Sequence, residues 1–343
     1  MKKNVLIFGA GRRARATVLP AFWSLREEYN IFGVVTKTVR DISLFSGKFI
    51  TRTRNDLEGI DFKKIDLIVL AVPIDQVRGI LASLTKFNTK DIYLILDTPV
   101  ISLKHLGSLK YSKLYKGVVV AEDFISLPNV IQYKKIIESG NIGKLKHLHL
   151  FHSGFKHHAL SMIKTVTGSR NFTYIISTKY FGETRIKKIC SGNGVKTTMI
   201  EPRDYDVAKN LLIGDKGMIA DYPINASSVI VLDYLYKDKR HNGISIDGLP
   251  IPPTATDEYF YSNIAEFTDE VSFINDLKIR GYMEIVRSLS NRSTAFIYSP
   301  IEGVYDNLAI KISDKLGFFF DFGFGRFSVF KSFIYLLIKI LPK

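Results

Sequence analysis

The sequence contains a single cysteine, Cys190, among 343 residues. One thiol excludes an internal disulfide framework and any zinc site built from cysteine pairs. Glycine and proline, with 24 and 11 copies, are not enriched, and 24% of the residues are charged, which is ordinary for a globular protein. These proportions exclude collagen-like, low-complexity and disordered classes. The length and the 46% hydrophobic content instead indicate a globular protein of about two domains.

Long hydrophobic runs are absent as well. No segment reaches the roughly 18 consecutive apolar residues of a spanning helix. The first apolar run, residues 5–8, is followed directly by Gly9 and is too short for a signal peptide, so we expect a cytoplasmic protein. Residues 327–343 are apolar on most faces with lysines interspersed, which predicts a basic amphipathic C-terminal tail. This tail either packs on the core or at a dimer contact, or it lies in a membrane surface at the inner face.

Acidic residues are scarce relative to basic ones, with 33 Asp and Glu against 48 Lys and Arg, for a net charge of +15. Such an excess favours anionic partners: phosphates, nucleic acid or anionic lipid. The basic residues are spread along the chain without a helix-turn-helix, zinc-finger or RNP1-type pattern, so we expect no nucleic-acid partner. A phosphate-bearing cofactor or substrate accounts for part of the excess, and a solvated surface accounts for the rest.

Short apolar strands alternate with helices over the first 120 residues. The predicted strands are residues 5–8, 31–36, 67–72, 92–96 and 117–121, and the predicted helices are residues 14–28 and 76–84. This alternation is typical of a doubly wound parallel sheet with right-handed crossovers. We therefore predict an α/β fold that begins with a Rossmann domain over residues 1–121.

The pattern changes after residue 122 to longer segments of alternating polarity. Strands are predicted at residues 145–151, 172–180, 218–221 and 228–236, and helices at residues 128–139, 267–290 and 304–316. These segments predict a second α/β domain over residues 122–326, with a large, mostly antiparallel open sheet.

A glycine-rich turn follows the first predicted strand. Gly9, Gly11 and Ala14 form a GxGxxA pattern between that strand and a helix. The first glycine allows a tight turn, the second lets a pyrophosphate approach the backbone, and the small third residue lets the helix pack closely. The turn, with Arg12 and Arg13 inside it, predicts a dinucleotide site at the helix N-terminus.

The end of the second predicted strand bears on the choice of cofactor. NAD sites usually place a carboxylate there to bind the ribose 2′-hydroxyl, but this sequence has Thr36, then Lys37 and Thr38, with Arg40 close behind. A hydroxyl and cations suit a 2′-phosphate, so we expect NADP, with NAD as the alternative.

Further segments, taken in their order along the chain, resemble the motifs of a known protein family. Residues 66–73 (DLIVLAVP), 94–100 (LILDTPV), 122–144 and 212–219 are similar to successive motifs of the glucose-fructose oxidoreductase, inositol dehydrogenase and rhizopine-catabolism (Gfo/Idh/MocA) family. The resemblance covers roughly residues 4–320 and is strongest up to about residue 168. It implies a Rossmann domain and a substrate domain whose sheet often mediates oligomerisation. It also implies hydride transfer between a nicotinamide and a sugar or polyol carbon, or transient oxidation that cleaves a glycoside.

The chain departs from the family pattern where protons are handled. Thr98 stands at the position of the family's catalytic lysine, so the resemblance implies an atypical member that lacks this lysine. The later family motif D-x-G-x-H-x-x-D resembles residues 154–161, in which His158 matches the histidine while Gly154 and Ser161 replace the two aspartates. A threonine is not a cationic acid or base, although its hydroxyl can hydrogen-bond a substrate.

The remaining groups define the expected site. His158 is the candidate base for the substrate hydroxyl, because imidazole titrates near neutrality. Lys156 and His157 are candidates for the missing positive charge. Where open α/β sheets bind ligands, at the carboxyl ends of their strands, we expect Val72, Pro73, Asp97 and Glu122 to line the cofactor crevice, with Asp97 also aiding catalysis.

Histidines also recur along residues 147–152, at His147, His149 and His152. The first two would share a strand face and the third need not, and no acidic ligand is nearby, so we expect no metal. The resulting prediction is an NADP-dependent sugar oxidoreductase, acting on a sugar or nucleotide sugar and forming a homo-oligomer. A role in surface-polysaccharide biosynthesis is a further hypothesis. The alternative is a protein that binds cofactor or sugar without turnover.

Overall fold

The structure, a computed structural model, describes residues 2–38, 41–44, 47–264, 273–290, 298–321 and 328–341. The chain divides into two compact units, each assembled from separate stretches of sequence. Unit 1 comprises Met1–Asp123, Pro253–Val304 and Tyr335–Lys343, and unit 2 comprises Phe124–Pro252 and Tyr305–Ile334. The C-terminal third thus contributes to both units, an arrangement that the linear boundaries at residues 121 and 326 do not express.

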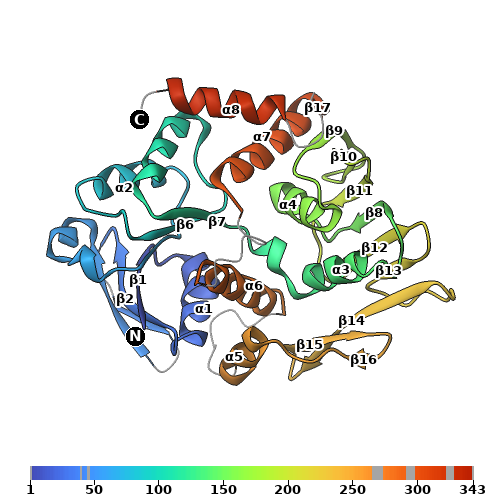
Figure 1. Cartoon of the computed structure of the whole chain (residues 1–343), viewed down its shortest axis with the longest axis horizontal. Coiled ribbons are helices and arrows are strands. Elements are labelled where there is room, and N and C mark those ends of the chain that lie inside the picture. Colours follow the sequence, from blue (N-terminus) through green and yellow to red (C-terminus); the bar gives the residue numbers. More distant parts are fainter. Residues whose placement is uncertain are drawn as a thin grey trace. The chain divides into compact units, whose positions relative to one another are not determined.

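Unit 1 is a wound α/β sheet (Figure 1). Its strands are β1 (Lys3–Phe8), β2 (Tyr29–Thr36), β3 (Asp41–Leu44), β4 (Gly47–Thr53), β5 (Leu67–Leu70), β6 (Tyr93–Asp97) and β7 (Gly117–Ala121). They lie in the order β3-β4-β2-β1-β5-β6-β7, and all pair in parallel except β3 with β4. The predicted Rossmann sheet is confirmed, and its apolar strands are buried on both faces, as parallel strands must be.

Helices complete unit 1. They are α1 (Leu19–Ser24), α2 (Val77–Leu84), α5 (Ala255–Asn263) and α6 (Phe273–Ser290), together with 3-10 segments at Arg54–Gly59, Phe62–Lys64 and Leu103–Leu114. A further 3-10 segment, Asp123–Ser126, begins at the last residue of this stretch of unit 1 and continues into unit 2. Although α6 lies far along the chain, it packs on the first helical segment in the core. The rings of Phe22 and Tyr282, for example, lie 6.2 Å apart and edge to face. The helix predicted at residues 267–290 is seen from Phe273, and residues 267–272 lie outside the described part.

Unit 2 contains the larger sheet. Its strands are β8 (Leu145–Phe151), β9 (Phe172–Lys179), β10 (Arg185–Ser191), β11 (Lys196–Glu201), β12 (Lys209–Gly214), β13 (Met218–Ala220), β14 (Val229–Lys237), β15 (Arg240–Ile246), β16 (Leu249–Pro250) and β17 (Phe318–Phe320). They lie in the order β16-β15-β14-β13-β12-β8-β11-β10-β9-β17. All pairs are antiparallel except β8 with β11 and β13 with β14, so the predicted mostly antiparallel sheet is confirmed.

The helices α3 (Pro128–Glu138) and α4 (Lys156–Thr167) belong to unit 2. The chain passes from unit 1 to unit 2 within α7 (Pro300–Leu316) and from unit 2 to unit 1 within α8 (Val329–Ile340). Among the described residues, no helix has both the length and the apolar character that crossing a bilayer requires.

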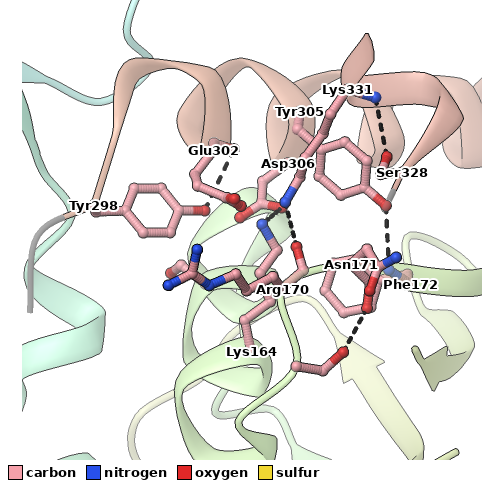
Figure 2. Close-up of polar contacts among 12 residues, drawn as sticks. Lys164, Arg170, Asn171, Phe172, Tyr298, Glu302, Tyr305, Asp306, Ser328 and Lys331 are labelled. Atoms are coloured by element: carbon pink, nitrogen blue, oxygen red, sulfur yellow. Dashed lines mark hydrogen bonds and ion pairs between the residues drawn. The ribbon is translucent and has the colours of Figure 1, made fainter. Parts of the chain in front are cut away.

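A buried polar network ties the C-terminal residues of unit 2 together (Figure 2). Tyr305 donates its hydroxyl proton to Asp321 over 2.9 Å, and Ser328 donates to the same carboxylate over 2.5 Å. Lys164 forms an ion pair with Asp306 at 2.6 Å. Each polar group is thus matched by a partner, as burial requires.

Candidate functional site

The glycine turn after β1 has the geometry expected of a pyrophosphate-binding turn. Gly9 has φ of 108°, and a Cβ built there would lie 2.1 Å from the carbonyl oxygen of Ala71, so only glycine fits. A Cβ at Gly11 would meet nothing within 4 Å, which leaves its backbone open to a ligand. Ala14 is fully buried against the sheet. The turn therefore has an open backbone at Gly11 beside a closely packed helix start, as pyrophosphate-binding turns do.

The helix that follows begins with a π-helical stretch, Ala14–Val18, before α1 continues it. π-bulges are uncommon in helices and occur frequently at functional sites. This one lies directly after the glycine turn, so the irregular backbone and the glycine turn are neighbours in the chain.

Arg13 turns its side chain toward the ends of other strands. Its Nε lies 3.2 Å from Asp97 at the end of β6, and its Nη1 lies 2.8 Å from Asp123, beyond β7. It also donates to Thr17 over 3.2 Å. Burial lowers the pKa of Arg13, but Asp123 and Asp97 raise it more, so the net pKa lies above its ordinary value. The guanidinium therefore stays charged and joins three segments of unit 1.

The predicted 2′-phosphate site ends β2. Thr36 is buried and donates its hydroxyl proton to the carbonyl of Thr38 over 2.5 Å. Lys37 and Thr38 are exposed. Arg40 lies outside the described residues. Among the described residues at this strand end, Lys37 is therefore the accessible cation.

The other predicted cofactor residues differ in exposure. Val72 and Asp97 are half-buried, Pro73 is exposed, and Glu122 is buried. Thr98 is half-buried and begins a cis peptide bond to Pro99. All of these residues lie at or just after the carboxyl ends of strands in unit 1, where wound sheets bind ligands.

One surface cavity of unit 1 lies elsewhere. It has a volume of about 210 Å³ and is lined by Lys3, Tyr29, Asp66, Leu67, Asp91, Tyr93, Lys116 and Leu289. These residues cluster at the amino ends of β1, β5 and β6. Because open α/β sheets bind ligands at the opposite ends of their strands, we do not include the cavity in the candidate site.

The histidine segment of unit 2 starts α4. Lys156, the first residue of that helix, has φ of 46°, in the left-handed region. Its backbone N–H donates to Glu201 over 2.7 Å. Glu201 in turn forms an ion pair with the fully buried Lys187, which lies 2.9 Å from Asp314. A buried charge network therefore fixes the entry to α4.

His157 and His158 follow in the first turn of α4, with ring centroids 4.1 Å apart. His158 stacks on Phe124 at 4.8 Å and lies 6.4 Å from Phe155. Burial, and after it the charges of His158 and Lys156, lower the pKa of His157 to about 2. His157 is therefore neutral at physiological pH and does not supply the positive charge for which it was a candidate. Lys156 is exposed, with Nζ 5.0 Å from the Phe155 ring centroid.

Arg203 belongs to this cluster but was not predicted. Its guanidinium carbon lies 5.6 Å from the ring centroid of Phe124, 5.0 Å from Phe155 and 4.5 Å from Tyr205. It follows the cis-bonded pair Glu201-Pro202 in a short segment between strands. That segment carries no specific sequence signal, so pattern reasoning had no means of finding it.

The histidines of β8 show the expected alternation. His147 and His149 lie on one face, with ring centroids 6.5 Å apart. His152 lies beyond the strand, and its Nδ1 is 2.6 Å from the carbonyl oxygen of Pro202.

Comparisons with known proteins show which solved structures share the fold of this chain. No protein-family model matches the chain, and no curated protein matches it in sequence. Solved structures do match. An oxidoreductase from Thermotoga maritima is 15% identical, with a TM-score of 0.61 over 97% of this chain and 100% of that one. The chain has the fold of this oxidoreductase.

Two further solved structures have a similar fold. A putative myo-inositol dehydrogenase from Sinorhizobium meliloti is 12% identical, with a TM-score of 0.62 over 93% of this chain and 99% of that one. A levoglucosan dehydrogenase in complex with NADH and L-sorbose is 14% identical, with a TM-score of 0.61 over the same shares. These are Gfo/Idh/MocA-like oxidoreductases at low identity, so the expected two-part fold is confirmed.

Proposed function

We propose that the protein is an NADP-dependent oxidoreductase that transfers a hydride between a nicotinamide and a carbon of a sugar or sugar derivative. The observation that carries the proposal is the glycine turn: Gly9 fits only as glycine, and the backbone at Gly11 is open. The same fold occurs in dehydrogenases, one of them solved with NADH. A turn of this geometry followed by a helix is the part of a Rossmann domain that binds a pyrophosphate.

Three sets of residues would hold the dinucleotide. The backbone of residues 9–14 would bind the pyrophosphate, with Arg12 exposed beside it. Lys37 and Thr38 would bind the 2′-phosphate of NADP, because the exposed ammonium of Lys37 follows the end of β2, where NAD sites usually carry a carboxylate. Val72, Pro73, Asp97 and Glu122 would line the nicotinamide end.

When bound, the nicotinamide supplies the hydride acceptor or donor, and the chain must move the hydroxyl proton. His158 would take or give that proton, since His157 beside it is held neutral by burial. Lys156 would add positive charge near the reacting oxygen. Thr98 would hydrogen-bond the substrate hydroxyl, and Asp97, already paired with Arg13, would orient groups rather than transfer a proton.

The substrate class proposed here is a sugar or nucleotide sugar, in agreement with the basic charge of the chain. Work on a nucleotide-linked or lipid-linked sugar in surface-polysaccharide biosynthesis would suit the same charge. One observation favours a second candidate: Thr98 replaces the lysine of the related motif. A protein so altered would bind cofactor or sugar without net turnover, or would cleave glycosides by transient oxidation.

Fluorescence titration with NADPH and NADH tests the proposal. We expect saturable binding with NADPH preferred, and loss of that preference in Lys37→Gln. Absence of binding to either nucleotide would refute it. If wild type oxidises or reduces a sugar and His158→Ala abolishes turnover, the enzyme is supported. If activity appears only in Thr98→Lys, the binding protein is supported.

We also propose that the exposed face of α8 contacts a membrane surface. Five large side chains of this helix are more than half exposed: Val329, Phe333, Tyr335, Leu336 and Ile340. The helix contains Lys331 and Lys339 and no acidic residue. An amphipathic helix of this kind binds anionic interfaces. Sedimentation with anionic liposomes tests this, and equal binding by protein lacking residues 327–343 would count against it.

Homo-oligomerisation through the larger sheet is a separate proposal. Ile176 of β9 is 40% exposed, and Phe318 and Phe320 of β17 are 50% and 47% exposed. Neighbouring apolar side chains on an exposed sheet face are typical of an interface. Light scattering during gel filtration should show more than one copy per particle, and Phe318→Lys should reduce the mass. A monomeric wild type would exclude the proposal.

A further inference from the structure

Arg203 is a cation positioned by rings rather than by carboxylates. Its guanidinium carbon lies over Phe124, Phe155 and Tyr205 at 4.5–5.6 Å. Among the residues that the structure describes, it donates no side-chain hydrogen bond and forms no ion pair. The adjacent Asp204 instead accepts the backbone N–H of Asp206 over 3.0 Å. Arg203 therefore keeps its donors available.

The surroundings of Arg203 favour an anion. Ring contacts restrict the side chain without using any of its five N–H donors, so little entropy is lost when those donors bind a ligand. The exposed Lys156 adds a second positive charge, with Nζ 5.0 Å from the Phe155 ring. A half-buried guanidinium in such a cluster fits the paired oxygens of a carboxylate or phosphoryl group.

The cluster includes the proposed proton-handling residue. His158 stacks on Phe124 at 4.8 Å, and Phe155 lies 6.4 Å from it, so Arg203 and His158 share two ring neighbours. The chain also couples them through Glu201, which accepts the N–H of Lys156 two residues before His158 and lies two residues before Arg203. A ligand held by Arg203 would therefore lie next to His158.

We infer that Arg203 binds an oxyanion, a carboxylate or a phosphoryl group, carried by the sugar substrate. The substrate class is then an anionic sugar rather than a neutral polyol. The role of the site in hydride transfer rests on the proposed function, whereas anion binding rests on the Arg203 cluster alone.

Calorimetric titration of the full-length protein at fixed ionic strength tests this inference. Four probes are compared: glucose, glucuronate, glucose 6-phosphate and UDP. At least one anionic probe should bind about tenfold or more tightly than glucose, because hydrogen bonds to charged groups are the strong ones. Glucuronate identifies a carboxylate site, glucose 6-phosphate a sugar phosphate site, and UDP a nucleotide diphosphate site. Equal binding of all four probes would overturn the inference.

Variants assign the preference to Arg203. Arg203→Gln should reduce binding of the preferred anion to the level of glucose. Arg203→Lys keeps the charge without the fork and should fall between. Arg170→Gln is the matched control, because Arg170 is exposed beyond the other end of α4, about 18 Å along the helix. Anion preference that survives Arg203→Gln, or that Arg170→Gln removes equally, would overturn the assignment.

The two proposals fail separately. Thermal unfolding of each variant shows whether it is folded, and Arg203→Lys still tests the fork if Arg203→Gln does not fold. NADPH titration of the same samples reports on the cofactor. Anion binding without NADPH binding would refute the oxidoreductase and keep the site. NADPH binding without anion preference would refute the site and keep the oxidoreductase.

Discussion

The turn after β1 in unit 1 and the turn into α4 in unit 2 both pass through a residue with positive φ, but only the first uses glycine. Gly9 has φ of 108° and Lys156 has φ of 46°. Glycine adopts this region freely, whereas a side chain with a Cβ costs on the order of 1–2 kcal/mol there. The first turn is therefore encoded locally, and the second must be stabilised by contacts from elsewhere.

Those contacts come from β10, β11 and α7. Glu201 accepts the N–H of Lys156, and Lys187 pairs with both Glu201 and Asp314. The buried ion network offsets the backbone strain and orients the first turn of α4. That turn contains His158, the residue proposed to transfer the hydroxyl proton. A short motif is therefore enough to form the turn of the proposed phosphate site, whereas the turn that carries the proposed histidine site depends on tertiary structure.

The largest effect is expected from Gly9→Ala. A Cβ 2.1 Å from the Ala71 carbonyl oxygen forces the turn away from β5, and the positive φ adds strain. We expect the free energy of unfolding to fall by about 2–5 kcal/mol, as urea denaturation would show. A loss below about 0.5 kcal/mol would mean that the turn relaxes and that its geometry is not locally fixed.

Gly11→Ala is the matched control for that variant. Its Cβ would enter open space, and Gly11 has no positive φ, so stability should change by less than about 0.5 kcal/mol. Binding of NADPH should nevertheless weaken by about tenfold or more, because the methyl group occupies the place of a phosphate. Unchanged binding would show that the cradle is not used.

Lys187→Met tests the buried network of unit 2. The variant leaves Glu201 buried without its cation, and we expect the free energy of unfolding to fall by about 3 kcal/mol in urea denaturation. Lys188→Met is the control, because this neighbour on β10 is exposed on the other face and should change stability by less than about 0.5 kcal/mol. Equal effects of the two variants would show that the buried network does not stabilise the turn into α4.

Much of unit 1 could be predicted from the sequence because its signals are local. The apolar runs in β1, β2, β5, β6 and β7 are short and end in buried residues or lie next to them, and the glycine turn follows β1 directly in the chain. The packing of α6 in the core of unit 1 could not be predicted, because amphipathic periodicity gives a helix but not the sheet that it covers.

The histidine site shows where sequence reasoning ended. His158 was found through resemblance to a motif, but Lys187, Glu201 and Arg203 lie 29–45 residues further along. Lys187 and Glu201 lie on strands whose register the sequence does not specify, and Arg203 lies just after one of them. The low pKa of His157 likewise follows from burial by tertiary contacts. A cation over aromatic rings has no fixed spacing in the chain, so Arg203 could be recognised only in three dimensions.

The pH dependence of stability tests whether His157, in the first turn of α4, is buried in its neutral form. The pKa of His157 is about 2 in the folded chain and about 6.5 when unperturbed, so the unfolded state binds the extra proton between these values. The stabilising contribution is complete above pH 6.5 and falls as pH drops, by about 1.4 kcal/mol per pH unit. Urea denaturation of His157→Gln between pH 6.5 and 4.5 should show a shallower loss than wild type. His147→Gln, altered on β8, should keep the wild-type slope, and equal slopes for all three proteins would contradict burial of a neutral His157.

The smallest effect, and the most direct test of the two turns, is Lys156→Gly. Glycine removes the cost of a left-handed side chain but gains freedom in the unfolded chain, so the net stabilisation should be about 0.5–1 kcal/mol. Lys156→Ala also removes the exposed ammonium but keeps the Cβ, and it should bring no gain. Thermal unfolding of the two variants separates backbone from side chain. If Lys156→Ala stabilises the protein as much as Lys156→Gly, the backbone at residue 156 is not strained. The contact of its N–H with the buried Glu201 would then not be needed to offset such strain.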